Sequence, residues 1–251
     1  MEVTSNMNCQ VMGIVNVTPD SFSDGGKFFT PEEAIRRANN LIEEGAAIID
    51  LGGESTRPGA TPLTWQEEWS RLEPVVDALT SSHSSLITHH LSLSIDTYHP
   101  ETMERALAKG ATIINCVYPE PIPELLKLLD RYPEAELVLP SSCLEDPLLH
   151  SSLIPHTSKL ILDPMIGFGT TREEDLAILK AIPELAAKGR VLIGASRKRI
   201  VKKLTGTKMP GKDLAGNLTI AVWAALQGAS IVRVHDVRET VQALKVLSAL
   251  V

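Results

Sequence analysis

Polar side chains stand near the ends of one short apolar run after another in this 251-residue chain. Runs of β-branched residues and leucine with little polar alternation are typical of strands buried on both faces of a parallel sheet, whose carboxyl ends meet at one side. We therefore expect the following residues to gather there: Asn16, Arg57, Asp96, Asn115, Asp163, Ser196, Lys198, Arg233 and His235. Any one of them taken alone could instead cap a strand end or complete a salt bridge.

These side chains divide into two chemical groups. One group consists of donors, most of them cationic: Asn16, Arg57, Lys198, Arg233 and His235. Guanidinium forks and an ammonium suit phosphate oxygens, so we expect this group to hold an anion. The other group consists of Asp96, Asn115 and Asp163. Carboxylates beside an amide suit a flat heterocycle with several N–H donors and a carbonyl, and Lys198 could bridge the two groups.

The first apolar run continues into a loop with turn chemistry. Residues 11–26 read VMGIVNVTPDSFSDGG, in which a buried strand ends near Asn16. Pro19 fixes φ for a turn, and Gly25 and Gly26 allow the chain to bend. We expect an active-site loop here, although an ordinary surface loop has the same composition.

Strand and helix patterns alternate along the chain. Strands are predicted at 11–17, 46–53, 91–97, 111–117, 136–140, 159–164, 190–196 and 231–235. Helices are predicted at 31–45, 65–79, 100–109, 122–131, 172–187, in a segment ending at 227, and at 237–250. The segment 80–90 reads as a connector, and 141–158 has no sustained helical period. Eight buried strands in a chain of this length favour a (β/α)₈ barrel over an open doubly wound sheet.

Composition limits the classes of function. Apolar residues make up 43% of the chain, which is enough for one large core, and the net charge of −7 without a long basic run argues against a nucleic-acid binder. The three cysteines include no C-x-x-C pair, so neither a disulfide framework nor a cysteine-rich zinc site is indicated. A reducing cytoplasm fits this usage, and we expect neither a secretory signal nor a membrane helix.

Several motifs together resemble the dihydropteroate synthase family of folate biosynthesis. They are GIVNVTPDSFSDGG (13–26), IIDLGGESTRPGA (48–60), SIDT (94–97), IIN (113–115), ILDPMIGFG (161–169), LIGASRK (192–198) and IVRVHDVRETVQAL (231–244). The resemblance implies one pterin-binding (β/α)₈ barrel over 1–251, either alone or as one domain of a fused folate enzyme. It also implies displacement of pyrophosphate from 6-hydroxymethyl-7,8-dihydropterin pyrophosphate by p-aminobenzoate, competition by sulfonamides, and a homodimer.

The resemblance also implies roles for individual residues. The pterin would be bound by Asp96, Asn115, Asp163 and Lys198. Pyrophosphate and Mg²⁺ would lie beside Asn16, Arg233 and His235, with Asn16 as the metal ligand. The aminobenzoate would be enclosed by Phe22, Thr56, Arg57, Pro58 and Ser196. Positive charge would develop at the pterin carbon as pyrophosphate leaves, and the cations at Arg57, Lys198, Arg233 and His235 would assist by binding the leaving group more tightly as its negative charge grows.

The sequence departs from the family pattern at three places. The usual Asn-Asp after the fourth strand is Asn115-Cys116, the usual Met-His of the fifth strand is absent from residues 139–143, and Thr170 replaces a lysine. The helix after the fifth strand also looks shortened or missing. Two alternatives therefore stay open: a pterin-binding paralogue with impaired catalysis, and a pterin-dependent methyltransferase that feeds a corrinoid, which would not need the STRPG loop.

Overall fold

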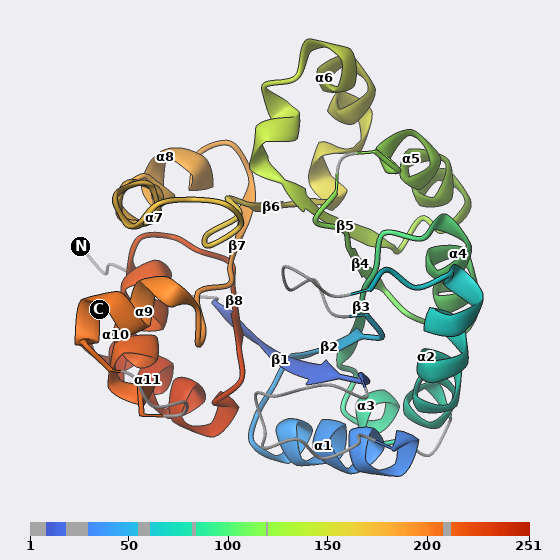
Figure 1. The fold of residues 1–251 in the computed structure, drawn as a ribbon, viewed down its shortest axis with the longest axis horizontal. Helices are drawn as coiled ribbons and strands as arrows, with labels where there is room; N and C mark the ends of the chain where they lie inside the picture. The colour runs from blue at the N-terminus through green and yellow to red at the C-terminus, as the bar shows by residue number, and fades with distance from the viewer. Residues whose placement is uncertain (1–8, 19–29, 55–60, 82–83, 119, 208–211) are drawn as a thin grey trace.

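A computed structural model describes residues 9–18, 30–54, 61–81, 84–118, 120–207 and 212–251 (Figure 1). Phe22, Thr56, Arg57 and Pro58 lie outside the described residues. The other candidate residues all lie within the described ranges.

The described strands form a closed parallel barrel in sequence order. They are β1 (Gln10–Asn16), β2 (Ile48–Gly52), β3 (Ser92–Asp96), β4 (Ile113–Asn115), β5 (Glu136–Pro140), β6 (Leu160–Asp163), β7 (Arg190–Ile193) and β8 (Ile231–Val234). The pairing of Gln10 with Ile231 joins β1 to β8 and closes the sheet. This closure confirms the predicted (β/α)₈ architecture, because an open doubly wound sheet would leave two unpaired edges.

Helices surround the barrel and connect successive strands (Figure 1). They are α1 (Pro31–Glu43), α2 (Trp65–Thr80), α3 (Ser85–Thr88), α4 (Pro100–Ala108), α5 (Ile122–Arg131), α6 (Pro147–Leu153), α7 (Arg172–Lys180), α8 (Ile182–Ala186), α9 (Arg199–Thr205), α10 (Leu214–Leu226) and α11 (Val237–Leu250). Threonine caps set several of the starts, since Thr30, Thr64 and Thr171 each form a capping box with a glutamate three residues later.

Strand residues alternate between the barrel interior and the surrounding helix layer. One residue from each of seven strands forms an interior apolar cluster: Met12, Ile48, Ile113, Val138, Ile161, Leu192 and Ile231. Their neighbours along the strands, such as Ile49 and Ile114, belong to the larger core shared with the helices. Because side chains alternate with a period of two, a residue two positions after an interior residue also faces the interior.

That two-residue step carries the interior from apolar to polar side chains. Asp50, Asn115, Asp163 and Arg233 each follow an interior isoleucine by two positions. The strand register places polar residues of neighbouring strands at the same height along the barrel axis, with Asp96 on β3 opposite Asn115 on β4. The carboxyl end of the barrel is therefore lined by charged and amide groups above an apolar floor.

Three predicted segments differ from the structure. The helix predicted at 172–187 is divided into α7 and α8, because Pro183 has no N–H to donate and its ring would clash with the Leu179 carbonyl one turn earlier. That carbonyl instead accepts a hydrogen bond of 2.9 Å from the Trp223 indole. The connector at 80–90 contains the single turn α3, and the fourth strand is three residues long rather than 111–117.

The connection after β5 contains a shortened helix, as the fold prediction allowed. α6 has seven residues and lies between two 3₁₀ segments, η2 (Ser141–Leu144) and η3 (Ile154–Lys159). Asp146 caps α6 by accepting from the Leu148 amide at 2.8 Å. These three helical segments are too short to show the 3.6-residue hydrophobic period from which a helix is predicted in a sequence.

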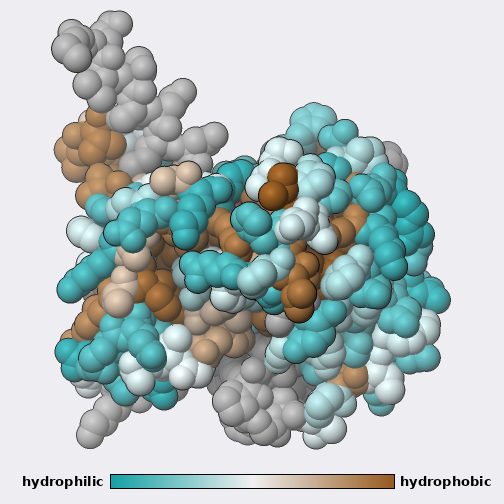
Figure 2. Space-filling model, turned by 90° about the horizontal axis from the view of Figure 1, so that it is seen from above, coloured by the Kyte–Doolittle hydropathy of each residue, from teal (hydrophilic) through white to brown (hydrophobic). Residues whose placement is uncertain are grey.

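The outer surface is predominantly hydrophilic on the face shown in Figure 2, with hydrophobic residues exposed in small groups. Among the described residues, no helix has the length and apolarity needed to span a membrane.

Candidate active site

The described candidate residues lie at the carboxyl ends of the strands. Asn16 ends β1, Asp96 ends β3, Asn115 ends β4 and Asp163 ends β6. A second set lies in or just after the last two strands: Ser196, Lys198, Arg233 and His235. The closed barrel brings these residues, far apart in sequence, to one end of the molecule.

Arg233 lies inside the barrel between two carboxylates. Its Nε donates to Asp50 Oδ2 at 2.6 Å, and its Nη2 donates to Asp96 Oδ2 at 2.6 Å. Burial by itself would lower the pKa of Arg233, but the two carboxylates raise it, so the guanidinium stays charged. Arg233, predicted as an anion ligand, thus lies beside the pterin-side acid Asp96.

Asp50 is a site residue that the sequence prediction missed. Its carboxylate is fully buried and accepts hydrogen bonds from Ser94 Oγ at 2.6 Å and from Asn115 Nδ2 at 3.3 Å. An aspartate inside the apolar run IIDLG was the available signal, because an unpaired buried charge is costly. Asp50 is hydrogen-bonded to both Arg233 and Asn115 and so fixes the orientation of both side chains.

Asn115 presents an unused acceptor within this network. Its Nδ2 is occupied by Asp50, whereas its buried Oδ1 has no hydrogen-bond partner in the part of the chain that the structure describes. A buried carbonyl oxygen without a partner is unfavourable, and an N–H donor of a ligand would satisfy it.

The carboxylates at this end have raised proton affinity. Burial raises the pKa of Asp96 to about 7, although Arg233 opposes the shift. Burial also raises the pKa of Asp163, with Lys198 opposing. Groups that are taken from water and partly compensated by fixed cations are characteristic of ligand sites.

Lys198 lies close to the segment that follows β6. Its Nζ donates to the Ile166 carbonyl at 2.6 Å and lies 4.5 Å from the centre of the Phe168 ring. Burial lowers the pKa of Lys198, while Asp163 raises it. Asp163 Oδ1 in turn accepts from the Met165 amide at 2.7 Å, so both residues hold the same segment.

His235 is held by residues from two other elements. Ser196 Oγ lies 3.1 Å from its Nδ1 and also accepts from its backbone amide at 3.3 Å, and Arg37 Nη2 on α1 donates to its carbonyl at 2.8 Å. Ser196, predicted to enclose the aminobenzoate, therefore contacts His235 as well.

The side-chain oxygen of Asn16 lies near Gly52 and Asp96 at the carboxyl end of the barrel. A Cβ added to Gly52 would lie 3.6 Å from Asn16 Oδ1 and 3.7 Å from Asp96 Cβ, so the absence of a side chain at Gly52 leaves room between them. Within the described ranges, no group of three or more His, Cys, Asp or Glu side chains could hold a metal ion. Mg²⁺ bound to a phosphate takes most ligands from phosphate and water, so a single amide oxygen is compatible with it.

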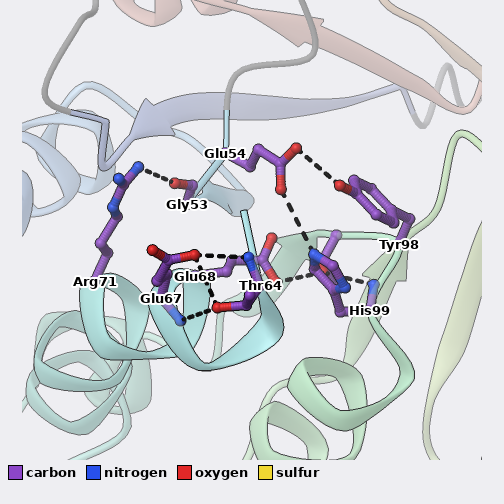
Figure 3. Close-up of polar contacts among 9 residues, drawn as sticks. Gly53, Glu54, Thr64, Glu67, Glu68, Arg71, Tyr98 and His99 are labelled. Atoms are coloured by element: carbon purple, nitrogen blue, oxygen red, sulfur yellow. Dashed lines mark hydrogen bonds and ion pairs between the residues drawn. The ribbon is translucent and has the colours of Figure 1, made fainter. Parts of the chain in front are cut away.

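A second polar cluster, which the sequence prediction also missed, lies beside the end of β2 (Figure 3). Tyr98 OH donates to Glu54 Oε1 at 2.8 Å, and His99 Nε2 lies 3.6 Å from Glu54 Oε2. Behind them, Glu68 accepts from Thr97 Oγ1 at 2.7 Å, and burial raises its pKa. The cluster fixes Glu54, which directly precedes residues 55–60 in the chain.

The fold and this site define a (β/α)₈-barrel enzyme class, and comparisons specify it further. The model of the family described as "Pterin binding enzyme" matches residues 12–147 and 148–235. The dihydropteroate synthase of Escherichia coli (strain K12) is 37% identical and aligns with 95% of this chain and 90% of its own length.

Two solved structures agree with that match. Dihydropteroate synthase of Xanthomonas albilineans with 4-aminobenzoic acid superimposes with a TM-score of 0.83 at 38% identity, covering 97% of this chain and 93% of that one. The Yersinia pestis enzyme with a sulfonamide drug gives 0.84 at 34% identity, covering 97% and 94%. The chain therefore belongs to the pterin-binding enzyme family, and within it to the dihydropteroate synthases, which are transferases.

Replacement of Arg233 tests the buried charge network. Arg233→Gln leaves the carboxylates of Asp50 and Asp96 without their cation, so the free energy of unfolding should fall by about 3–5 kcal/mol at pH 8. The folded-state pKa of Asp96 lies above its unfolded value of 3.8 and should rise further. Folding then favours the protonated acid, so the loss should shrink as the pH falls from 8 toward 5. Urea unfolding at both pH values measures this.

Arg238→Gln is the matched control, because Arg238 is an exposed cation on α11 that lies 3.9 Å from Glu44. It should change stability by less than about 0.5 kcal/mol. A loss in Arg233→Gln that is equal at pH 5 and pH 8 would contradict the assignment of buried, uncompensated carboxylates.

Proposed function

We propose that this protein condenses 6-hydroxymethyl-7,8-dihydropterin pyrophosphate with p-aminobenzoate to give 7,8-dihydropteroate and pyrophosphate. The main support is the buried set of acceptors at the carboxyl end of the barrel, in which Asn115 Oδ1 lacks a partner among the described residues. The relatives named above carry this activity in their names, and one of them is solved with 4-aminobenzoic acid.

The pterin fits the acceptor side of the site. Its ring N–H and amino groups would donate to Asp96, Asn115 Oδ1 and Asp163, and Lys198 Nζ would donate to its carbonyl. Because Asp96, Asn115 and Asp163 end rigid strands and Lys198 is held by the Ile166 carbonyl, these groups need little ordering when the ligand binds.

The reaction breaks one bond and forms another at the same carbon. The bond between the pterin methylene carbon and the pyrophosphate oxygen breaks with its electron pair leaving on pyrophosphate, and the electron-rich pterin stabilises the resulting cation. The aminobenzoate nitrogen then forms the new C–N bond and releases one proton to solvent. This SN1-like order needs no strong general base, so the residues of the chain act mainly by stabilising the leaving charge.

The leaving pyrophosphate is assigned to the cations around β8. Arg233 lies in β8 and faces the interior, His235 directly follows β8, and Arg57 is assigned to the same anion from the sequence. Asn16 would hold Mg²⁺ through its amide oxygen. A bound Mg²⁺ supplies a Lewis acid that neutralises charge on the pyrophosphate oxygens. The aminobenzoate is assigned to Phe22, Thr56, Arg57, Pro58 and Ser196.

The departure from the family pattern at Cys116 does not alter the interior hydrogen-bonding set, whereas in the departure at 139–143 Pro140, opposite Asp163, occupies an interior position without a side-chain donor or acceptor. Cys116 follows the interior residue Asn115 by one position, and the thiols of Cys116 and Cys143 are buried in the core shared with the helices. Burial raises the pKa of the Cys116 thiol to about 12, which keeps it neutral. The placement of Cys116 outside the interior favours the active synthase over the impaired paralogue, and the relatives named as synthases favour it over the methyltransferase.

A coupled assay for dihydropteroate tests the proposal directly. The purified chain with dihydropterin pyrophosphate, p-aminobenzoate and Mg²⁺ should release pyrophosphate and form dihydropteroate, and a sulfonamide should compete with p-aminobenzoate. Binding of the pterin without turnover would support the impaired paralogue instead. Absence of both binding and turnover would refute the proposed function.

Asp163→Asn tests the pterin assignment. The substitution keeps the shape but places an NH₂ where an acceptor is needed, so pterin binding should weaken by about 2–5 kcal/mol in isothermal titration. Asp146→Asn, at the cap of α6, is the control and should bind as the wild type does. Unchanged affinity in Asp163→Asn would show that Asp163 accepts a hydrogen bond from the Met165 amide but does not bind the pterin.

We also propose that the chain forms a homodimer through α10 and α11. Trp223 and Leu226 are exposed on α10, and Val246 and Leu250 on the adjoining α11, where Leu250 is 76% exposed. Sedimentation equilibrium should give twice the chain mass of 27.2 kDa, and the double variant Trp223→Glu/Leu250→Glu should give the monomer. Leu148→Glu on α6 is the control, and a dimer that survives the double variant would exclude this surface.

A further inference from the structure

The segment between β6 and α7 is tightly wound and contacts Lys198. Met165, Gly167 and Gly169 all have positive φ, at 61°, 78° and 75°. Met165 is a non-glycine residue in a conformation that such residues seldom adopt, so contacts from outside the segment have to hold it.

Asp175, in the first turns of α7, holds this segment. Its Oδ1 accepts from the Gly167 amide at 2.9 Å and from Thr170 Oγ1 at 2.5 Å. Thr170 Oγ1 also accepts from the same Gly167 amide at 2.9 Å, which closes a three-membered hydrogen-bonded clamp. Asp175 is 1% exposed, so these bonds are shielded from water.

The clamped residue Gly167 lies between the two residues that contact Lys198. Ile166 accepts from Lys198 Nζ at 2.6 Å, and the Phe168 ring lies 4.5 Å from it. A Cβ at Gly167 would lie 3.1 Å from Lys198 Cδ, so the segment packs directly on the lysine stem. The position of the Gly167 amide therefore determines where the ammonium group can be held.

We propose that Asp175, acting with Thr170 through the Gly167 amide, is a positioning residue that sets Lys198 for the pterin substrate. This inference rests on the proposed function for its kinetic consequence, although the contact with Lys198 does not. The family pattern that the sequence resembles has a lysine at the position of Thr170, and lysine has no hydroxyl to accept from Gly167. The clamp in this form thus belongs to chains with a hydroxyl residue at that position.

Steady-state kinetics with both substrates test the proposal. Asp175→Ala removes the acceptor and should lower kcat/KM for dihydropterin pyrophosphate by about tenfold to a hundredfold, with KM for p-aminobenzoate unchanged. Thr170→Val removes the hydroxyl and should give a smaller loss in the same direction. Thr170→Ser restores the hydroxyl and should restore the wild-type value.

Thr171→Ala is the matched structural control. Thr171 caps the same helix by accepting from Glu174 at 3.2 Å but has no hydrogen bond to Gly167 in the clamp. It should lower Tm and leave kcat/KM for the pterin substrate within about twofold. An equal kinetic loss in Thr171→Ala and Asp175→Ala would show that only helix stability matters, and would overturn the proposal.

The pH profile separates charge from geometry. Burial lowers the pKa of Lys198, and Arg233 lowers it further. The pKa is raised by three carboxylates, Asp163, Asp175 and Asp96. Asp175→Asn keeps an acceptor but removes the charge, so it should move the alkaline limb of kcat/KM to lower pH. Thr170→Val should leave that limb in place. Identical profiles for wild type and Asp175→Asn would show that the charge of Asp175 does not act on Lys198, which would support positioning through the Gly167 amide alone.

Acylation of Lys198 tests the contact without any turnover. Pulse labelling with acetic anhydride at fixed pH, followed by peptide mass spectrometry, should show several-fold faster labelling of Lys198 in Asp175→Ala than in Thr171→Ala. A wild type without synthase activity would refute the proposed function while this labelling difference still supported the clamp. Unchanged labelling and unchanged kinetics in Asp175→Ala would refute the clamp in an active enzyme.

Discussion

The interior of this barrel has to hold charged groups away from water, and the contact of Arg233 with Asp50 and Asp96 makes that possible. A guanidinium can serve two carboxylates at once because its donors form a planar fork. The charge of Arg233 keeps Asp50 ordered, and Asp50 in turn accepts a hydrogen bond from the side-chain amide of Asn115. The unused oxygen of Asn115 is therefore aimed by a chain of contacts that begins on the opposite side of the barrel.

The change from apolar floor to polar site takes place over a single two-residue step on four of the strands, β2, β4, β6 and β8. Ile48, Ile113, Ile161 and Ile231 fill the interior, and the next interior residue on each of these strands is charged or an amide. The floor excludes water below the site, which strengthens the electrostatic interactions above it.

Residues outside the interior then orient the groups that could bind a ligand. Arg37 and Ser196 hold His235, and Asp175 holds the segment that contacts Lys198. The cluster of Glu54 with Tyr98 and His99 fixes the chain beyond β2 in a similar way (Figure 3). These supporting contacts come from helices and loops. The segment held by Asp175 contains Thr170, so a departure from the family pattern can be accommodated outside the strand motifs.

The sequence by itself determined the barrel and the order and approximate positions of its strands, because strand periodicity and helix caps are local properties. Asp96 and Asn115 lie at strand ends in the structure, in agreement with the polar residues that the sequence shows near the end of each apolar run. Only the tertiary structure decided the partners: the enclosure of Arg233 by Asp50 and Asp96, the contact of Ser196 with His235, and the break before Pro183 bridged by Trp223. These contacts join residues from 39 to 183 positions apart, and which side chains meet over such separations depends on how the closed barrel sets its register, which no local pattern contains.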